Sequence, residues 1–106
     1  PGERDVRLMK TKRLLKLKHD HLELGFLSAH VTREDGDAAA WSLLVESPGD
    51  PDVFRDHLAA ATSMEFTMMT RDGESLRGEA DVSSLSDGTD SATMVVLAGV
   101  GTLRPA

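Results

Sequence analysis

A His-x-His pair, His19 and His21 with Asp20 between them, comes nearest to a reactive site in this sequence. On an extended strand both imidazole rings point to the same side, and such pairs bind divalent metal ions. A metal site needs a third ligand, and His30 and His57 are the histidines that remain. The pair and its central Asp are equally typical of a polar turn, so we favour the turn and predict no metal centre.

The patterns that mark common catalytic and ligand sites are incomplete in this chain. No serine stands in a Gly-x-Ser-x-Gly elbow, and the absence of Cys excludes thiol catalysis and Cys-ligated zinc. The Asp87–Asp90 segment lacks the ligand series and the closing Glu of an EF-hand. No helix is expected after Gly99–Gly101, although a phosphate-binding loop requires one. We therefore predict that the protein is not an enzyme and needs no cofactor.

Basic residues are concentrated at the start of the chain. Residues 1–18 hold seven of the 12 Lys and Arg residues against two acids, whereas residues 19–106 hold five Arg against 16 acids. The first segment therefore carries a net charge of +5 and the second −11, which together give the −6 of the whole chain. The candidate binding residues are those of this basic arm: Lys10, Lys12, Arg13, Lys16 and Lys18.

Three interpretations of the basic arm follow from this asymmetry. The arm can contact the acidic body of a second copy, and complementary charge of this kind sets register and encounter rate. It can contact nucleic acid, but the acidic body repels a duplex, and the chain offers no Tyr, one Trp and three Phe for stacking. It can also form a solvated edge strand protected by its lysines. We favour contact with a second copy.

The size and composition are those of one soluble globular domain, with 106 residues of which 40% are hydrophobic and 28% charged. We interpret residues 1–9 as a tag or flexible extension and residues 10–106 as a single β domain. The longest apolar run, Met94–Ala98, is far shorter than the roughly 20 residues of a membrane-crossing helix. We predict no membrane partner and a cytoplasmic location, or a virion if the protein is phage-derived.

Apolar residues alternate with a period of two, which predicts a mainly β protein. The alternation changes parity between Leu17 and Leu22, and a single strand cannot hold both halves on one face. We predict a tight turn at residues 18–21 in preference to a bulge.

A second change of parity near Gly25–Phe26 predicts a bulge or a barrel corner, where glycine is common. The strand that follows is expected to place three apolar side chains on one face: Leu27, Ala29 and Val31. Residues 32–38 are predicted to form a polar turn. The next strand should present one apolar face made of Trp41, Leu43 and Val45.

One helix is predicted, at about residues 51–62. Asp50 is the expected N-cap and Pro51 the first helical residue, a position whose N–H has no partner within a helix. Phe54, Leu58 and Ala61 recur at helical spacing and should form the buried face. Together with the strands, this helix gives the predicted fold: a small antiparallel β-barrel or β-sandwich with one α-helix.

The clearest hairpin has its turn at Arg71-Asp72-Gly73. A three-residue loop with Gly73 in the left-handed conformation places every apolar side chain on one face, whereas a two-residue loop mixes the core and solvent faces. The predicted cross-strand pairs are Met68 with Leu76, Phe66 with Gly78 and Met64 with Ala80. In the second pair, the Phe66 ring is expected to cover Gly78, which weakens its strand because glycine has no side chain to pack.

The last predicted strand, at residues 93–103, is apolar on both faces. One face carries Val95 and Leu97, and the other carries Met94, Val96, Ala98 and Val100. An exposed second face is an aggregation liability in a monomer, so it is either covered by the helix or buried against a neighbouring subunit. Our candidates for a subunit seam are Val96, Ala98 and Val100.

The second half of the chain shows a helix, a hairpin, a strand containing Gly78-Glu79-Ala80, a polar loop at Ser83–Ser91, and a closing strand that runs into Gly99-Val100-Gly101 with Leu103 beyond it. In this order of elements, residues 52–104 resemble phage and prophage tail tube proteins. The resemblance implies a sandwich or barrel with one flanking helix. It also implies protomers joined edge to edge into stacked hexameric rings, whose acidic lumen lets DNA slide through.

In such rings the doubly apolar strand would lie in a subunit seam, and the basic arm would bridge rings. We therefore predict a non-enzymatic structural protein that forms homo-oligomers, with nucleic acid as a further partner in the lumen or at the arm. The alternative is a small β-barrel binding domain whose basic arm contacts nucleic acid or an anionic ligand.

Overall fold

The computed structural model describes residues 9–34, 37–86 and 93–106 and has a mainly β fold with one helix, as the sequence predicts. Six antiparallel strands close into a barrel, and a two-residue strand extends it at one edge. The elements in chain order are β1 (Met9–His19), β2 (Leu22–Glu23), β3 (Ser28–Glu34), β4 (Asp37–Glu46), α1 (Pro51–Ala60), β5 (Ser63–Thr70), β6 (Ser75–Ser86) and β7 (Met94–Pro105).

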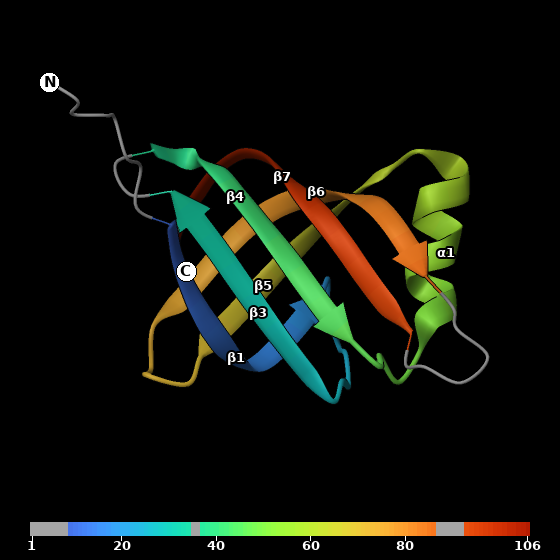
Figure 1. Ribbon diagram of the computed structural model, residues 1–106, viewed down its shortest axis with the longest axis horizontal. Helices are drawn as coiled ribbons and strands as arrows, with labels where there is room; N and C mark the ends of the chain where they lie inside the picture. Colours follow the sequence, from blue (N-terminus) through green and yellow to red (C-terminus); the bar gives the residue numbers. More distant parts are fainter. Residues whose placement is uncertain (1–8, 35–36, 87–92) are drawn as a thin grey trace, which may run out of the picture.

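The barrel has the strand order β1-β3-β4-β7-β6-β5, and β5 pairs with β1 to close it. In Figure 1, β3, β4 and β7 form the near wall, β1, β5 and β6 form the far wall, and α1 lies at one end. The last two residues of β1, Lys18 and His19, also pair with β2. Every strand of the barrel therefore has a neighbour on both sides.

One row of side chains from each strand fills the interior, because successive residues of a strand point to opposite sides. The expected row of Trp41, Leu43 and Val45 is buried, as are Val95 and Leu97 on β7. The complete apolar core consists of Leu14, Leu17, Leu24, Ala29, Val31, Trp41, Leu43, Val45, Phe54, Met64, Phe66, Met68, Leu76, Ala80, Val82, Val95, Leu97 and Leu103.

The predicted turn after β1 is confirmed. His19 pairs with Leu22 across a two-residue loop, and Asp20 has a φ of 58°. Further back in β1 the register shifts between Leu14 and Lys16, so that both Leu14 and Leu17 point inward while Leu15 is exposed. This bulge bends β1, which pairs with β3 through residues 9–13 and with β5 through residues 14–19.

Two expectations for the middle of the chain are wrong in detail. Leu27 does not join Ala29 and Val31 inside, because it lies before β3 begins and is 75% exposed. The polar segment at residues 32–38 is mostly strand: β3 continues to Glu34 and β4 begins at Asp37. Residues 35–36 lie outside the described part of the chain. Cross-strand pairing therefore extends further than the polar composition suggested.

The helix is confirmed but ends earlier than expected, at Ala60. Pro51 is its first residue, whereas the Asp50 side chain makes no capping hydrogen bond. Ala61 terminates it in a left-handed conformation, with a φ of 55°. Phe54 is fully buried and stacks on Phe66 with ring centroids 6.5 Å apart, but Leu58 and Ala61 are exposed. The buried face of α1 is therefore narrower than its apolar spacing predicted.

The hairpin register is confirmed in full. Met68 pairs with Leu76, Phe66 with Gly78 and Met64 with Ala80. Gly73 has a φ of +94°, a backbone conformation that L-residues rarely adopt. The aromatic side chain that lies closest to the position of a Cβ on Gly78, however, is Trp41 from β4.

Trp41 lies against the backbone of β6 and β7 where both strands carry a glycine. A Cβ on Gly99 would lie 2.3 Å from the indole Nε1, and a Cβ on Gly78 would lie 2.7 Å from Cζ2. The indole Nε1–H donates a hydrogen bond to the Gly101 carbonyl oxygen at 3.2 Å. Gly101 has a φ of +77°, and the register of β7 against β6 shifts here between Arg77 and Glu79. Trp41 therefore holds the bend of β7.

We expect Gly99→Ala to destabilise the fold by about 1–3 kcal/mol, because the added methyl group overpacks the Trp41 ring and the surrounding side chains have little room to move. The shift in the urea unfolding midpoint measures this effect. Gly25→Ala is the control, since a Cβ there has no neighbour within 4 Å. Equal stability of the Gly99 variant and the wild type would contradict the role of this contact.

Candidate functional site

The basic arm forms the first strand of the barrel, and the alternation of β1 divides its residues. Arg13, Lys16 and Lys18 are exposed on the outer surface, and Lys10 is exposed near the start of the strand. Lys12 is only partly exposed because its side chain turns towards the hairpin between β5 and β6. Sequence reasoning placed all five residues in one binding arm, whereas the structure gives Lys12 a partner within its own chain.

Lys12 is the centre of an ion-pair network at one end of the barrel. Its Nζ lies 2.8 Å from Glu74 Oε1 and 3.0 Å from Asp72 Oδ2. Arg33 on β3 donates to both oxygens of Glu74 at 3.0 Å. Two basic side chains from β1 and β3 thus fasten the β5–β6 turn, and four charges are neutralised within the protomer.

The network shifts the pKa values of Asp72, Glu74 and Lys12 in the directions that favour their charged forms. A hydrogen bond from the Thr70 hydroxyl, followed by that from Lys12, lowers the pKa of Asp72 to about 2. Hydrogen bonds from Lys12 and Arg33 lower the pKa of Glu74, and hydrogen bonds to Glu74 and Asp72 raise the pKa of Lys12. Thr70 is fully buried, and its oxygen accepts a hydrogen bond from the Glu74 N–H at 2.9 Å.

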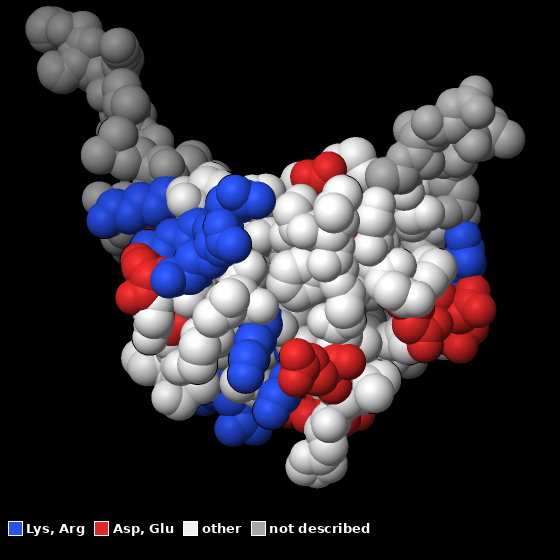
Figure 2. Space-filling view, turned by 90° about the horizontal axis from the view of Figure 1, so that it is seen from below, with Lys and Arg blue, Asp and Glu red and all other residues white. Residues whose placement is uncertain are grey.

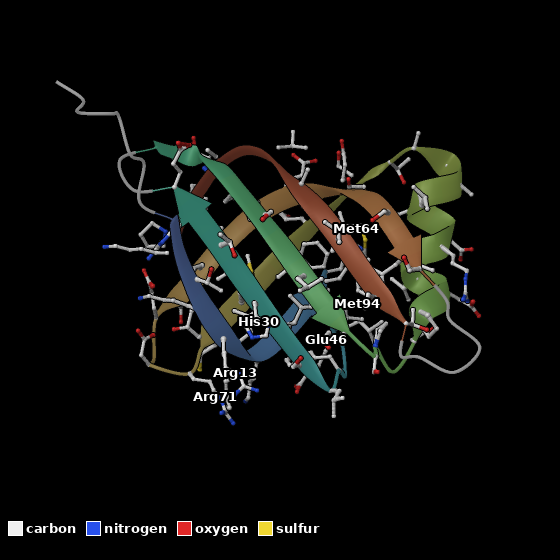
Figure 3. All side chains as sticks on the ribbon, in the orientation of Figure 1. Arg13, His30, Glu46, Met64, Arg71 and Met94 are labelled. Carbon is white, nitrogen blue, oxygen red and sulfur yellow. The ribbon has the colours of Figure 1, made fainter. Side chains whose placement is uncertain are left out.

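The outward basic residues form a second, different group, which we call the cationic face: Arg13, Lys16, Lys18 and Arg71. The Arg71 N–H donates to the Arg13 carbonyl oxygen at 2.9 Å, and Figure 3 shows both side chains pointing away from the barrel on the same side. None of the four forms an ion pair with a residue that the structure describes. In Figure 2, most of the visible Lys and Arg lie towards the end away from α1, with some Asp and Glu beside them, while the helix end shows a group of Asp and Glu next to a smaller basic patch.

The other candidate residues lie on the outer surface of β7, in a set that we call the apolar row: Met94, Val96, Ala98 and Val100. All four are exposed, the three larger ones by 36–41%, so α1 does not cover them. β7 is nevertheless a central strand, between β4 and β6. Of the two explanations that the sequence left open, cover by the helix is thus excluded within the protomer.

Carboxylates flank the apolar row along its length, in a set that we call the carboxylate border: Glu46, Glu79 and Asp81. Glu46 on β4 pairs across the sheet with Met94, while Asp81 and Glu79 on β6 pair with Ala98 and Val100. Glu46 and Met94 are labelled in Figure 3. Within the described residues none of these carboxylates forms an ion pair, although Ser28 and Ser63 donate hydrogen bonds to Glu46 and Asp81.

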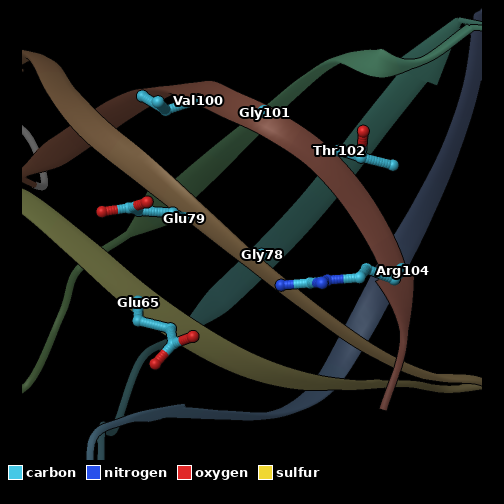
Figure 4. A pocket seen from close by; sticks show the side chains of 7 residues that line it. All are labelled: Glu65, Gly78, Glu79, Val100, Gly101, Thr102 and Arg104. Atoms are coloured by element: carbon cyan, nitrogen blue, oxygen red, sulfur yellow. The ribbon is translucent and has the colours of Figure 1, made fainter.

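A groove of about 280 Å³ adjoins the end of the apolar row, where β7 bends away from β6 (Figure 4). Gly78 and Gly101 line it, together with the side chains of Glu65, Glu79, Val100, Thr102 and Arg104. Glu65 is paired with Arg77 at 3.2 Å. The groove therefore offers one carboxylate and one guanidinium outside that pair, which suits contact with polar or charged side chains.

The histidines are arranged differently from the expected pair. The His19 ring meets the His57 ring edge-on, with centroids 5.1 Å apart, and its Nδ1 lies 3.1 Å from the Glu65 carbonyl oxygen. His57 Nδ1 lies 2.8 Å from the Thr62 hydroxyl, whereas His21 is exposed in the turn. Within the described segments, no three His or acidic side chains are placed to hold a metal ion. The contact between His19 and His57 instead joins α1 to β1.

Comparison with known proteins yields no relative: no protein-family model, no curated protein and no solved structure matches this chain. In the part of the chain that the structure describes, no helix has the length and apolar character needed to cross a bilayer.

Sequence reasoning missed Arg71 and the carboxylate border. Arg71 was assigned to a turn, and its position beside Arg13 depends on the closure of β5 onto β1. The border follows from the pairing of β7 with β4 and β6, which connects segments far apart in the sequence.

We expect Asp72→Asn to lower the thermal stability of the protein at neutral pH. We also expect the stability of this variant to depend less on pH in the acid range than that of the wild type. The pKa of Asp72 is lowered from 3.8 to about 2 in the fold. The ionised Asp72 carboxylate therefore contributes fully to the stability of the fold above about pH 4, and this contribution disappears as the pH falls through 2. The difference in thermal midpoint between wild type and variant should therefore shrink between pH 5 and pH 2. Asp56→Asn controls for net charge, and a difference that stays constant with pH would contradict the assignment.

Proposed function

We propose that this protein is a non-enzymatic assembly protein whose copies associate into homo-oligomers. The observation that carries the proposal is the exposed apolar row on a central strand of a closed barrel. The interior already holds Val95 and Leu97 from the same strand, so the outer row cannot be buried inside the protomer by a change of register. Contiguous exposed apolar side chains of this kind typically mark protein–protein contacts.

The specific form of assembly in this proposal is a ring of the tail tube type, in a virion or in the cytoplasm. The order of elements and the Gly99–Gly101 segment support this form through their resemblance to phage tail tube proteins. The net charge of −11 on residues 19–106 would suit a lumen through which DNA passes without binding.

Association should be seen by sedimentation velocity and light scattering as the concentration of the protein rises. In Val96→Gln/Val100→Gln, we expect half-assembly to require at least about tenfold more protein, because apolar area is lost and two amides must be desolvated. Negative-stain images of the concentrated wild type should show closed particles.

Leu58→Gln is the matched control, since Leu58 is 41% exposed, as is Val100, but lies on α1. It should assemble like the wild type, and circular dichroism should confirm that all variants are folded. A wild type that stays monomeric at every concentration and salt level would reject the proposed function.

A second candidate function is binding of nucleic acid by the cationic face. The observation that favours it is the exposure of Arg13, Lys16, Lys18 and Arg71, with no ion pair to a described residue. Four contacts to phosphates would release counterions and give a steep dependence of affinity on salt.

If this function is correct, fluorescence anisotropy with a duplex DNA should give a plot of log affinity against log salt with a slope of roughly −3 to −4. Arg13→Ala/Arg71→Ala should reduce this slope by about 2. Arg55→Ala is the control, since Arg55 lies on α1 and pairs with Asp52. No binding at low salt would reject this candidate.

A further inference from the structure

We propose that the contact between copies is heterologous: the apolar row and carboxylate border of one copy dock on the cationic face of the next. This inference rests on the proposed function and specifies its partner surface. The occupant of the cationic face is thus a second copy of this chain, and the two surfaces that meet are different.

The two surfaces lie on opposite sides of the barrel. In the order β1-β3-β4-β7-β6-β5, β7 is three strands away from β1 in either direction around the closed barrel. A copy that uses its β7 side therefore keeps its β1 side free for another neighbour. Contacts of this head-to-tail kind continue from copy to copy, whereas a twofold contact stops at a dimer.

The charges of the two surfaces are complementary. The cationic face carries four positive charges and the carboxylate border three negative ones, and neither set is neutralised by described residues of its own chain. A twofold contact between two β7 sides would bring carboxylates against carboxylates, and one between two β1 sides would bring cations against cations. Like charges facing each other in an interface are unfavourable, so the charges select the heterologous arrangement.

The β1 side also carries an exposed apolar side chain. Leu15 is 53% exposed because the bulge after Leu14 turns it outward, and the exposed Lys16 follows it in the sequence. A phosphate backbone gains nothing from contact with this leucine, whereas Val96 and Val100 would bury against it.

Two variants, each of which keeps only one of the two docking surfaces, test this inference directly. The row variant, Val96→Gln/Val100→Gln, keeps its cationic face. The face variant, Arg13→Glu/Lys16→Glu, keeps its apolar row. Each alone should remain monomeric at concentrations where the wild type assembles, because each lacks one of the two surfaces. Mixed in equal amounts, they should form a 1:1 dimer by sedimentation velocity and nothing larger.

A chemical-shift titration locates the contact. In ¹⁵N-labelled row variant, added unlabelled face variant should shift the amide signals of Leu15, Lys16 and Lys18. The signals of Val53 and Leu58 on α1 should not move. A chain that combines Arg13→Glu/Lys16→Glu with Glu79→Lys/Asp81→Lys restores opposite charges between copies and should recover self-assembly.

The outcomes separate this inference from the proposed function. A monomeric wild type overturns both. A wild type that assembles while the mixed variants stay monomeric, or a face variant that still dimerises alone, overturns the heterologous contact and leaves assembly standing. A face variant that assembles normally but loses DNA binding assigns the cationic face to nucleic acid and likewise overturns the inference.

Discussion

Closure of the barrel around a filled interior is the constraint on which the surfaces of this protein depend. Each strand contributes one row to the interior, and the largest members, among them Leu17, Phe66 and Leu97, are fully buried. The opposite row of every strand must therefore face outward. Trp41 strengthens this constraint, because its ring fits only against the bare backbone of Gly78 on β6 and Gly99 on β7, and a slip of β7 by one residue would place a side chain against it. The exposure of the apolar row is thus a property of the fold itself.

The same alternation separates two roles within one run of basic residues. Lys12, which faces the end of the barrel, is bound by Asp72 and Glu74, and Glu74 also binds Arg33. This network connects β1, β3 and the β5–β6 turn where the barrel closes, so it serves the fold. Arg13, one residue further along, points the other way and has no such partner among the described residues. A segment that looks uniform in composition thus contains a structural lysine and a free basic surface.

The parts of the fold that sequence could predict are those with local patterns. The register of β5 on β6 follows from the alternation around Met64, Phe66 and Met68. It also follows from Gly73, because only the three-residue loop places this glycine at the position that needs a left-handed backbone. The two faces of β7 follow from period two alone. The failures depend on distant contacts. Trp41 on β4 contacts Gly78 and Gly99, and Lys12 contacts a turn some sixty residues later in the chain. Phe54 is the only buried residue of α1, so Leu58 stays exposed at the barrel end. No spacing within one segment encodes which strands become neighbours, so the candidate site could be predicted only as two separate lists of residues.

The magnitudes involved favour closed assemblies over dimers if the proposed contact is correct. Met94, Val96 and Val100 keep 36–41% of their surface exposed, and Leu15 about half, so burying what remains exposed stabilises one contact by roughly 2–5 kcal/mol. Each exposed ion pair adds about 0–1 kcal/mol and is screened by salt. Bringing two copies together costs about 4–15 kcal/mol in lost translational and rotational freedom, so a single contact is weak. A ring forms as many contacts as it has copies, yet it incurs one association cost fewer, because the last contact joins chains that are already held together. Where the rotation between copies closes, a weak, charge-selected, head-to-tail contact therefore favours either free monomers or complete rings, with few species in between. Where the rotation does not close, the same contact continues into an open filament.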